Sequence, residues 1–232
     1  MILSVDLLCA GYKDLAVLRD VSFDVKQGEV HCLLGRNGAG KSTAMKAIMG
    51  LIPVTSGRVL LNSNDLVDTP ASLRGKQGLG YVPQGRRLFA DLTVAENLEI
   101  GLLTRPSPRS ARDAALDLFP RLRERLAQRA ATLSGGEQQM LAIARALCTE
   151  PDVLLMDEPT EGLQPSMIDA IRVVIRRLRD SGTAIVLIEQ RLETVLRLAD
   201  RVTFLENGRT RETVSVSDLK GKPDLTKQYL GV

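Results

Sequence analysis

Apolar residues occur along the chain in two kinds of pattern. Near the N-terminus they alternate with polar residues in short segments, 4–9 and 21–25, as in antiparallel strands with one solvated face. Further on they form continuous runs, at 30–34, 153–156 and 184–188, with helical spacing between them. Because strands that alternate with helices form parallel sheets covered on both faces, we expect an α/β fold with a mainly parallel core sheet.

The pattern changes in the middle of the chain. From Val94 to about Ala131 the sequence is mostly helical and charged. We therefore expect a single domain over residues 1–232. Its core, with an N-terminal antiparallel β subdomain, is formed by 1–83 and 151–232, and an α-helical subdomain is inserted at 84–150.

Composition narrows the class of protein. Of 232 residues, 44% are hydrophobic and the net charge is only +3, which allows a large core but is too little for a dedicated nucleic-acid binder. Aromatic residues make up 3%, which disfavours stacking platforms for single strands. No apolar run approaches the ~20 residues that cross a bilayer, and no signal core follows the N-terminus. We therefore expect a cytosolic chain.

The histidine, the cysteines and the C-terminal region offer little chemistry of their own. The three cysteines lie far apart, so neither a zinc site nor a disulfide framework is indicated. His31 stands inside an apolar run, and we interpret it as a packed strand residue rather than a catalytic base. After a strand at 201–206 the pattern predicts a turn at 207–208 and a polar tail.

A glycine-rich loop follows the apolar run at 30–34. The segment GRNGAGKST, 35–43, fills every fixed position of the pattern GxxxxGK[ST] and precedes a predicted helix at 41–49. Such glycines let the loop wrap tightly around an anion, its N–H groups favour phosphates, Lys41 adds positive charge, and the Ser42 hydroxyl can ligate Mg²⁺. The predicted phosphate-binding residues are Gly35, Asn37, Gly38, Gly40, Lys41, Ser42 and Thr43.

Two carboxylates end the apolar run at 153–156. Asp157 and Glu158 come at the carboxyl end of a strand, the edge where open α/β sheets place their ligands. Beside a phosphate loop, Asp157 is predicted to complete a magnesium shell and Glu158 to polarise an attacking water. The alternative is a strand that ends in two solvated acids.

A second anion site is predicted at the segment LSGGEQ, 133–138. Ser134 would cap the helix that continues to Leu147, while Gly135 and Gly136 leave N–H donors free for a second phosphate. A simple helix cap is the alternative.

The order of GRNGAGKST, Gln84, LSGGEQ and LLMDEP resembles the ATP-binding cassette (ABC) family of nucleotide-binding subunits, from Tyr12 to the C-terminus. The resemblance implies a P-loop ATPase that uses ATP and Mg²⁺. It further implies a head-to-tail dimer, in which 35–43 of one subunit and 134–138 of the other enclose each ATP. The residues of the second segment that would bind ATP are Ser134, Gly135, Gly136 and Gln138.

The same resemblance assigns two further residues. Tyr12 would stack on adenine, although an ordinary turn aromatic is the alternative. Gln84 would join Ser42 and Asp157 as a metal ligand and connect the γ-phosphate to the helical subdomain.

Two positions depart from the common pattern of the family. Gln190 stands where the family usually has a histidine, and a glutamine can hydrogen-bond a γ-phosphate but cannot titrate. Gln164 stands where many relatives have an aspartate that communicates across the dimer, which puts coupling between the two sites in question. The predicted catalytic set is Glu158, Lys41, Gln190 and Gln84.

Segments 84–89, 159–165 and 189–190 resemble the branch of the family that powers uptake of branched-chain amino acids, and 159–165 resembles its urea-uptake relatives still more. This implies a peripheral subunit on the cytoplasmic face of the inner membrane. It would pair with itself or a related ABC subunit, bind transmembrane permease subunits, serve a periplasmic solute-binding protein indirectly, and bind no nucleic acid.

The cargo and some contacts stay open at this point. Urea, another short amide or a branched-chain amino acid would be carried, and 84–89 with the helical insert would contact the permease. Arg86 and Arg87 are either part of that contact or an ordinary solvated face. The rival functions are a DNA-repair or translation-associated ABC ATPase and a regulatory module that only binds ATP.

Overall fold

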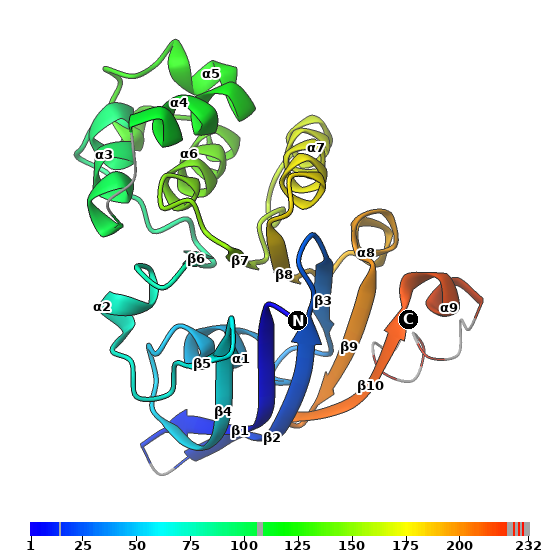
Figure 1. Cartoon of the computed structure of the whole chain (residues 1–232). Coiled ribbons are helices and arrows are strands. Elements are labelled where there is room, and N and C mark those ends of the chain that lie inside the picture. Colours follow the sequence, from blue (N-terminus) through cyan, green and yellow to red (C-terminus); the bar gives the residue numbers. More distant parts are fainter. Residues whose placement is uncertain (14, 106–108, 222–224, 226, 228, 230–232) are drawn as a thin grey trace.

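The computed structural model describes residues 1–13, 15–105, 109–221, 225, 227 and 229. Within these residues its strands form two sheets (Figure 1). The strands are β1 (Leu3–Tyr12), β2 (Leu15–Val25), β3 (Val30–Leu34), β4 (Val54–Leu61), β5 (Asn64–Asp65), β6 (Leu79–Val82), β7 (Val153–Asp157), β8 (Ala184–Ile188), β9 (Arg201–Glu206) and β10 (Arg209–Ser215). The helices are α1 (Lys41–Ile48), α2 (Ala71–Arg74), α3 (Val94–Thr104), α4 (Arg109–Leu118), α5 (Pro120–Arg123), α6 (Gly135–Leu147), α7 (Pro165–Asp180), α8 (Leu192–Leu198) and α9 (Val216–Gly221), with a 3₁₀ turn at Ala130–Thr132.

The core sheet has the strand order β10-β9-β3-β8-β7-β6, and all its pairs except β10 with β9 are parallel. Every residue of β3, β7 and β8 is buried, as expected for strands covered on both faces. The α/β fold with a mainly parallel core sheet is therefore confirmed. No helix in the part of the chain that the structure describes is both long and apolar enough to span a bilayer.

The second sheet is antiparallel, with the order β2-β1-β4-β5. The strand β1 continues beyond the predicted end at Cys9, and β2 begins before the predicted start at Val21. Pairs such as Gly11 with Ala16 extend the ladder between them beyond several register shifts. Such bulges interrupt the alternation of apolar and polar residues without ending the strand. The N-terminal antiparallel subdomain is thus present, with longer strands than the pattern indicates.

Two hydrophobic clusters cover the two faces of the core sheet. Cys32, Leu154 and Leu187 face a cluster that includes α6 and α7, whereas Leu33 and Val186 face one that includes α1 and the antiparallel sheet. The helices α3 to α6 form a separate group beyond the ends of β6 and β7 (Figure 1). The sheet therefore supports a helical layer on one side and the antiparallel sheet on the other.

The polar tail predicted after the turn at 207–208 is partly wrong. Residues Arg209–Ser215 form β10, an edge strand antiparallel to β9, and α9 follows it. Only Val214 of β10 is buried, so the segment lacks the alternation by which a strand is recognised. Hydrogen bonds to β9 hold it in place.

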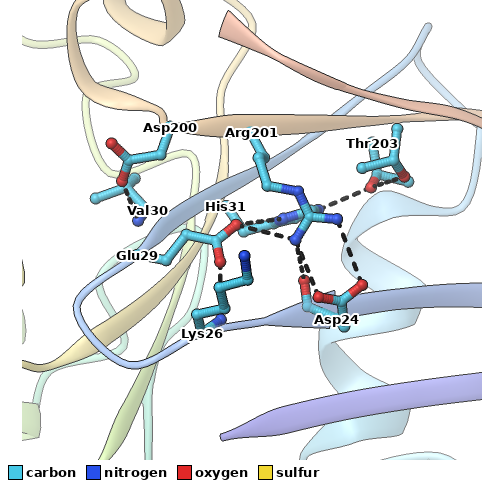
Figure 2. Close-up of polar contacts among 9 residues, drawn as sticks. Asp24, Lys26, Glu29, Val30, His31, Asp200, Arg201 and Thr203 are labelled. Carbon is cyan, nitrogen blue, oxygen red and sulfur yellow. Dashed lines mark hydrogen bonds and ion pairs between the residues drawn. The ribbon is translucent and has the colours of Figure 1, made fainter. Parts of the chain in front are cut away.

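His31 is fully buried in β3, which confirms its interpretation as a packed strand residue. Its Nε2 lies 2.7 Å from Thr203 Oγ1, its ring stacks on Phe23, and its Nδ1 lies 3.4 Å from Glu29 Oε1. Figure 2 shows how Arg201 Nη1 reaches Asp24 at 3.0 Å and Glu29 at 3.3 Å. This cluster ties β2 of the antiparallel sheet to β3 and β9 of the core.

The Arg201 guanidinium has the largest effect on the ionisation of Asp24 in this cluster. Its hydrogen bond and positive charge lower the pKa of Asp24 below the ordinary value of 3.8, against the effect of burial. The pKa of Glu29 is also lowered: burial alone would raise it, but hydrogen bonds from His31 and the Lys26 N–H and the nearby charges outweigh burial. Both carboxylates therefore stabilise the fold only while they are ionised.

We expect Arg201→Met to lower the free energy of unfolding at pH 7, measured by urea titration. Because the pKa values of Asp24 and Glu29 are lowered, their stabilisation is present above the ordinary values of 3.8 and 4.5 and is lost below them. The difference between wild type and variant should therefore narrow as the pH falls from 5 to 3. Arg211→Met, which removes an exposed pair with Glu206, is the control and should change little. A gap that stays constant down to pH 3 would contradict this account.

Candidate active site

Three parallel strands bring the sequence motifs to one edge of the core sheet. The strand β3 pairs with β8 in register Leu33 to Ile188, and β8 pairs with β7 in register Ile188 to Asp157. The Glu158 N–H continues the ladder by donating to Ile188 O at 3.0 Å. The glycine loop, the two carboxylates and the residues after β8 therefore leave the sheet side by side, where open α/β sheets bind their ligands.

The glycine loop connects β3 to α1 in a conformation that requires glycine. A Cβ at Gly35 would lie 2.2 Å from Leu205 O, and Gly40 has a φ of +103° in the turn that begins the helix. Lys41 Nζ donates to Gly35 O at 2.7 Å and Arg36 O at 3.1 Å. Burial lowers the pKa of Lys41, and the carboxylates of Glu158 and Asp157 oppose that change. The carbonyl groups of the loop therefore hold the Lys41 ammonium group within the loop.

Ser42 and Asp157 face each other across the start of α1. Ser42 Oγ donates to Asp157 Oδ1 at 3.1 Å, and Asp157 is 2% exposed. Burial, together with the charge of Glu158, raises the pKa of Asp157 despite the hydrogen bond from Ser42. A hydroxyl and a carboxylate that converge in this way offer the hard oxygen ligands that suit Mg²⁺.

Two amide side chains hold Glu158. Gln190 Nε2 donates to Glu158 Oε1 at 2.7 Å, and Gln84 Nε2 donates to Glu158 Oε2 at 3.3 Å and to Glu161 at 2.9 Å. The backbone of Glu158 is left-handed, with a φ of +51°. Such a conformation persists only where the surroundings determine it, and it is common at functional sites.

A cleft of about 430 Å³ joins most of these residues. It is lined by Val17, Asn37, Gly38, Gly40, Lys41, Ser42, Thr43, Gln84, Glu158, Glu161 and Gln190. Sequence reasoning missed Val17 and Glu161, because an isolated Val in a strand and a Glu in a turn match no motif. Tyr12 lies outside this lining, at the end of β1, where its hydroxyl accepts from Lys46 Nζ at 3.4 Å.

The LSGGEQ segment lies at a different cleft. Ser134 caps α6 by accepting from the Glu137 N–H, while the Glu137 carboxylate accepts from the Ser134 N–H. Although burial opposes it, hydrogen bonding to Ser134 lowers the pKa of Glu137. The helix cap of the alternative interpretation is therefore present, and within the described residues the glycine loop lines a different cleft from Gln138 of this segment.

Two side chains from other segments lie against the glycines of that segment. A Cβ at Gly135 would lie 2.9 Å from Arg86 Nη2, and one at Gly136 would lie 2.3 Å from Met167 Cε. Arg86 Nη1 also donates to Gln138 Oε1 at 3.0 Å. Arg86 is half-buried and bonded rather than part of a solvated face, whereas Arg87 is exposed.

The second cleft, of about 500 Å³, lies between these residues and the carboxylates of Glu158 and Glu161. Its lining includes Arg86, Gln138, Glu158 and Glu161. The two acidic residues therefore border both clefts, so the glycine loop and the LSGGEQ helix are connected through the loop that follows β7.

We expect Asp157→Asn to raise the midpoint of thermal unfolding at pH 7, measured without nucleotide or divalent metal. Because the pKa of Asp157 is raised, its ionised form destabilises the fold at neutral pH, and this cost disappears as the pH falls toward 3.8. The difference in unfolding midpoint between Asp157→Asn and wild type should therefore decrease as the pH falls from 7 toward 3.8. Asp152→Asn, at the other end of β7, is the control and should give no comparable gain. A lower midpoint for Asp157→Asn at pH 7 would contradict the argument.

Comparison with known proteins identifies the family. The ABC transporter family model matches residues 18–161. The chain is 43% identical over 231 residues to the high-affinity branched-chain amino acid transport ATP-binding protein BraG of Pseudomonas aeruginosa, covering 99% of both chains. It is 41% identical over 228 residues to the probable branched-chain amino acid transport ATP-binding protein LivF of Archaeoglobus fulgidus, covering 97% of both. A solved ATP-binding subunit of an ABC transporter superposes with a TM-score of 0.86 at 32% identity, covering 100% of this chain and 97% of that one. The chain therefore belongs to the ABC transporter family, as an ATP-binding and ATP-hydrolysing subunit.

Proposed function

We propose that the chain powers an importer of branched-chain amino acids. The observation that carries this proposal is its identity to BraG and LivF over nearly its full length. Urea or another short amide is the second candidate cargo, on the resemblance of 159–165 to urea-uptake relatives. A peripheral position on the cytoplasmic face of the inner membrane follows from this role.

The cleft next to the glycine loop is the proposed ATP site. Gly35, Asn37, Gly38, Gly40 and Thr43 would cradle the phosphates, mainly through backbone N–H groups. Lys41 would exchange its bonds to the Gly35 and Arg36 carbonyls for a phosphate oxygen. The exchange is favourable because it replaces two neutral acceptors by an anion.

Magnesium is the proposed cofactor. Ser42, Asp157 and Gln84 would hold it, and when bound it would neutralise developing charge on the phosphates. The close approach of Ser42 Oγ to Asp157 supports this set, and Gln84 lines the same cleft as Ser42.

Glu158 is the proposed group that polarises the attacking water. Gln190 and Gln84 fix its two oxygens, so the carboxylate is oriented before substrate arrives. Gln190 is an amide, so this orientation does not depend on a titrating histidine. Tyr12 remains the proposed stacking partner of adenine.

A head-to-tail dimer is the proposed active assembly, either of two copies or with a related ABC subunit. Ser134, Gly135, Gly136 and Gln138 of one subunit would meet the glycine loop of the other. The separation of the two motifs at different clefts within one chain supports this. A related cassette, 25% identical with a TM-score of 0.82, has been solved as a dimer.

Closure of that dimer would involve two parts of each chain. We propose the boundaries that the sequence pattern predicts: residues 1–83 and 151–232 form the core, and residues 84–150 form the helical subdomain. Gln84 stands at the first boundary and bonds Glu158 and Glu161 of the core, so it is suited to transmit the state of the nucleotide.

A groove of about 370 Å³ between the core and the helices is the proposed contact with a permease subunit. It runs along α2, β6, α3 and α6, and Phe89 at its edge is 50% exposed. An exposed aromatic side chain beside a groove is suited to an interaction surface, here for a helix on the cytoplasmic side of a membrane protein.

We expect Glu158→Gln to slow ATP hydrolysis by on the order of a hundredfold or more while ATP binding is retained. The amide keeps the size of the side chain but cannot accept a proton from water. Phosphate release measures turnover and a fluorescent ATP analogue measures binding. Near-normal turnover would remove Glu158 from this role.

We expect ATP hydrolysis to be stimulated by co-purified permease subunits and to be indifferent to DNA and ribosomes. Stimulation should be lost with Phe89→Asp, at the groove, and kept with Val173→Asp, an exposed apolar residue of α7. Stimulation by DNA or ribosomes would favour a repair or translation role instead. Absence of hydrolysis under every condition would favour a regulatory module that only binds ATP.

A further inference from the structure

A buried carboxylate between the two catalytic loops has no role in the function proposed above. Glu189 directly follows β8 and is 3% exposed. Its Oε1 accepts from Thr160 Oγ1 at 2.5 Å. The backbone N–H groups of Thr160, Gln190 and Arg191 also favour the ionised form of the carboxylate and so lower its pKa. Groups from the loops after β7 and β8 thus act on one side chain.

These donors are the main compensation for the buried charge. Among the described residues no basic side chain forms an ion pair with Glu189. Burial raises the pKa of Glu189, and the hydrogen bonds from both loops oppose that rise. A buried carboxylate that relies on N–H and O–H donors is stable only if those donors stay in place, so it restrains the loops that supply them.

The restrained loops carry the residues of the proposed reaction. Thr160 lies two residues after Glu158, and Gln190 is the next residue after Glu189. Gln190 Nε2 in turn donates to Glu158 Oε1 at 2.7 Å. The loops after β7 and β8 are therefore linked twice, once at the cleft surface by Gln190 and Glu158, and once beneath it by Thr160 and Glu189.

The left-handed backbone of Glu158 makes the second link necessary. A non-glycine residue at a φ of +51° can relax to an ordinary conformation unless its neighbours prevent it. Pairing of the Glu158 N–H with Ile188 O fixes the residue on one side, and the bond from Thr160 to Glu189 fixes it on the other.

We propose that Glu189 is a positioning residue for hydrolysis, which through its bond from Thr160 and its direct chain link to Gln190 sets the geometry between Glu158 and Gln190. It lies outside the lining of the cleft and acts through these two residues. The proposal rests on the role of Glu158 proposed above.

The first test is Thr160→Val, which removes the hydroxyl and keeps the shape of the side chain. We expect kcat for ATP hydrolysis to fall by roughly tenfold to a hundredfold, as for a misplaced catalytic group, with KM for ATP within about twofold. Thr160→Ser, which retains the hydroxyl, should restore most of the rate. Glu189→Gln keeps the size of the side chain but removes its charge, and it should lower kcat in the same way. It replaces Thr160→Val as the test if that variant does not fold.

A double variant separates positioning from general loss of structure. If Thr160 acts through Glu158, then Thr160→Val should slow Glu158→Gln no further, although it slows the wild type. Thr203→Val is the matched control: it removes another buried hydroxyl that bonds a titratable side chain, His31, away from the catalytic loops, and should leave kcat unchanged.

Three results would overturn the proposal. These are normal kcat in both Thr160→Val and Glu189→Gln, a rise of KM that alone explains the loss, or full additivity of Thr160→Val with Glu158→Gln. If kcat is low in Glu158→Gln but normal in both Thr160→Val and Glu189→Gln, only this inference is refuted. Normal turnover in Glu158→Gln would instead refute the proposed function itself.

Discussion

The active site depends on the parallel register of three buried strands, β3, β8 and β7. Leu33 pairs with Ile188 and Ile188 pairs with Asp157, so the three strands end at nearly the same level. A shift of one residue in any of these pairs would exchange the side chains that face the two hydrophobic clusters and would disturb the packing of both. Packing of apolar side chains on two faces therefore determines where the polar groups at the strand ends lie.

These polar groups are costly to the fold on which they stand. Burial lowers the pKa of Lys41 and raises the pKa of both Asp157 and Glu189, so in each case the charged form is the disfavoured one. The chain offsets this with local donors and acceptors: loop carbonyls for Lys41, the Ser42 hydroxyl for Asp157 and the Thr160 hydroxyl for Glu189. A site in which charges are held by neutral dipoles is ready to bind an anion and a cation that match those charges better.

Much of this arrangement could be predicted because it is local in sequence. The glycine loop and its helix are contiguous, and the strand before Asp157 is a continuous apolar run, so both were found with nearly the observed bounds. The edge strand β10 could not be found, because its stability comes from pairing with β9 rather than from a buried face. The bond between Thr160 and Glu189 joins residues 29 apart, and no spacing rule announces it. One feature of the sequence does indicate a role for Glu189: it follows a buried strand at the same sheet edge as Asp157 and Glu158, the edge where open α/β sheets place their ligands.

The C-terminal end of α1 lies between the cleft at the glycine loop and the groove at α2. Arg74 is almost fully buried at the end of α2, and its guanidinium donates to Ala47 O and Ile48 O, the last carbonyls of α1, as well as to Thr69 O and Val67 O. The negative end of the helix dipole suits this cation, and Gly50 leaves room for it, since a Cβ there would lie 2.7 Å from Arg74 Nε. Any movement of α1 that did not carry α2 with it would leave the buried Ile48 carbonyl without this donor, at a cost of about 1–3 kcal/mol. Arg74 therefore joins α1, which begins at the glycine loop, to α2, which forms one wall of the groove.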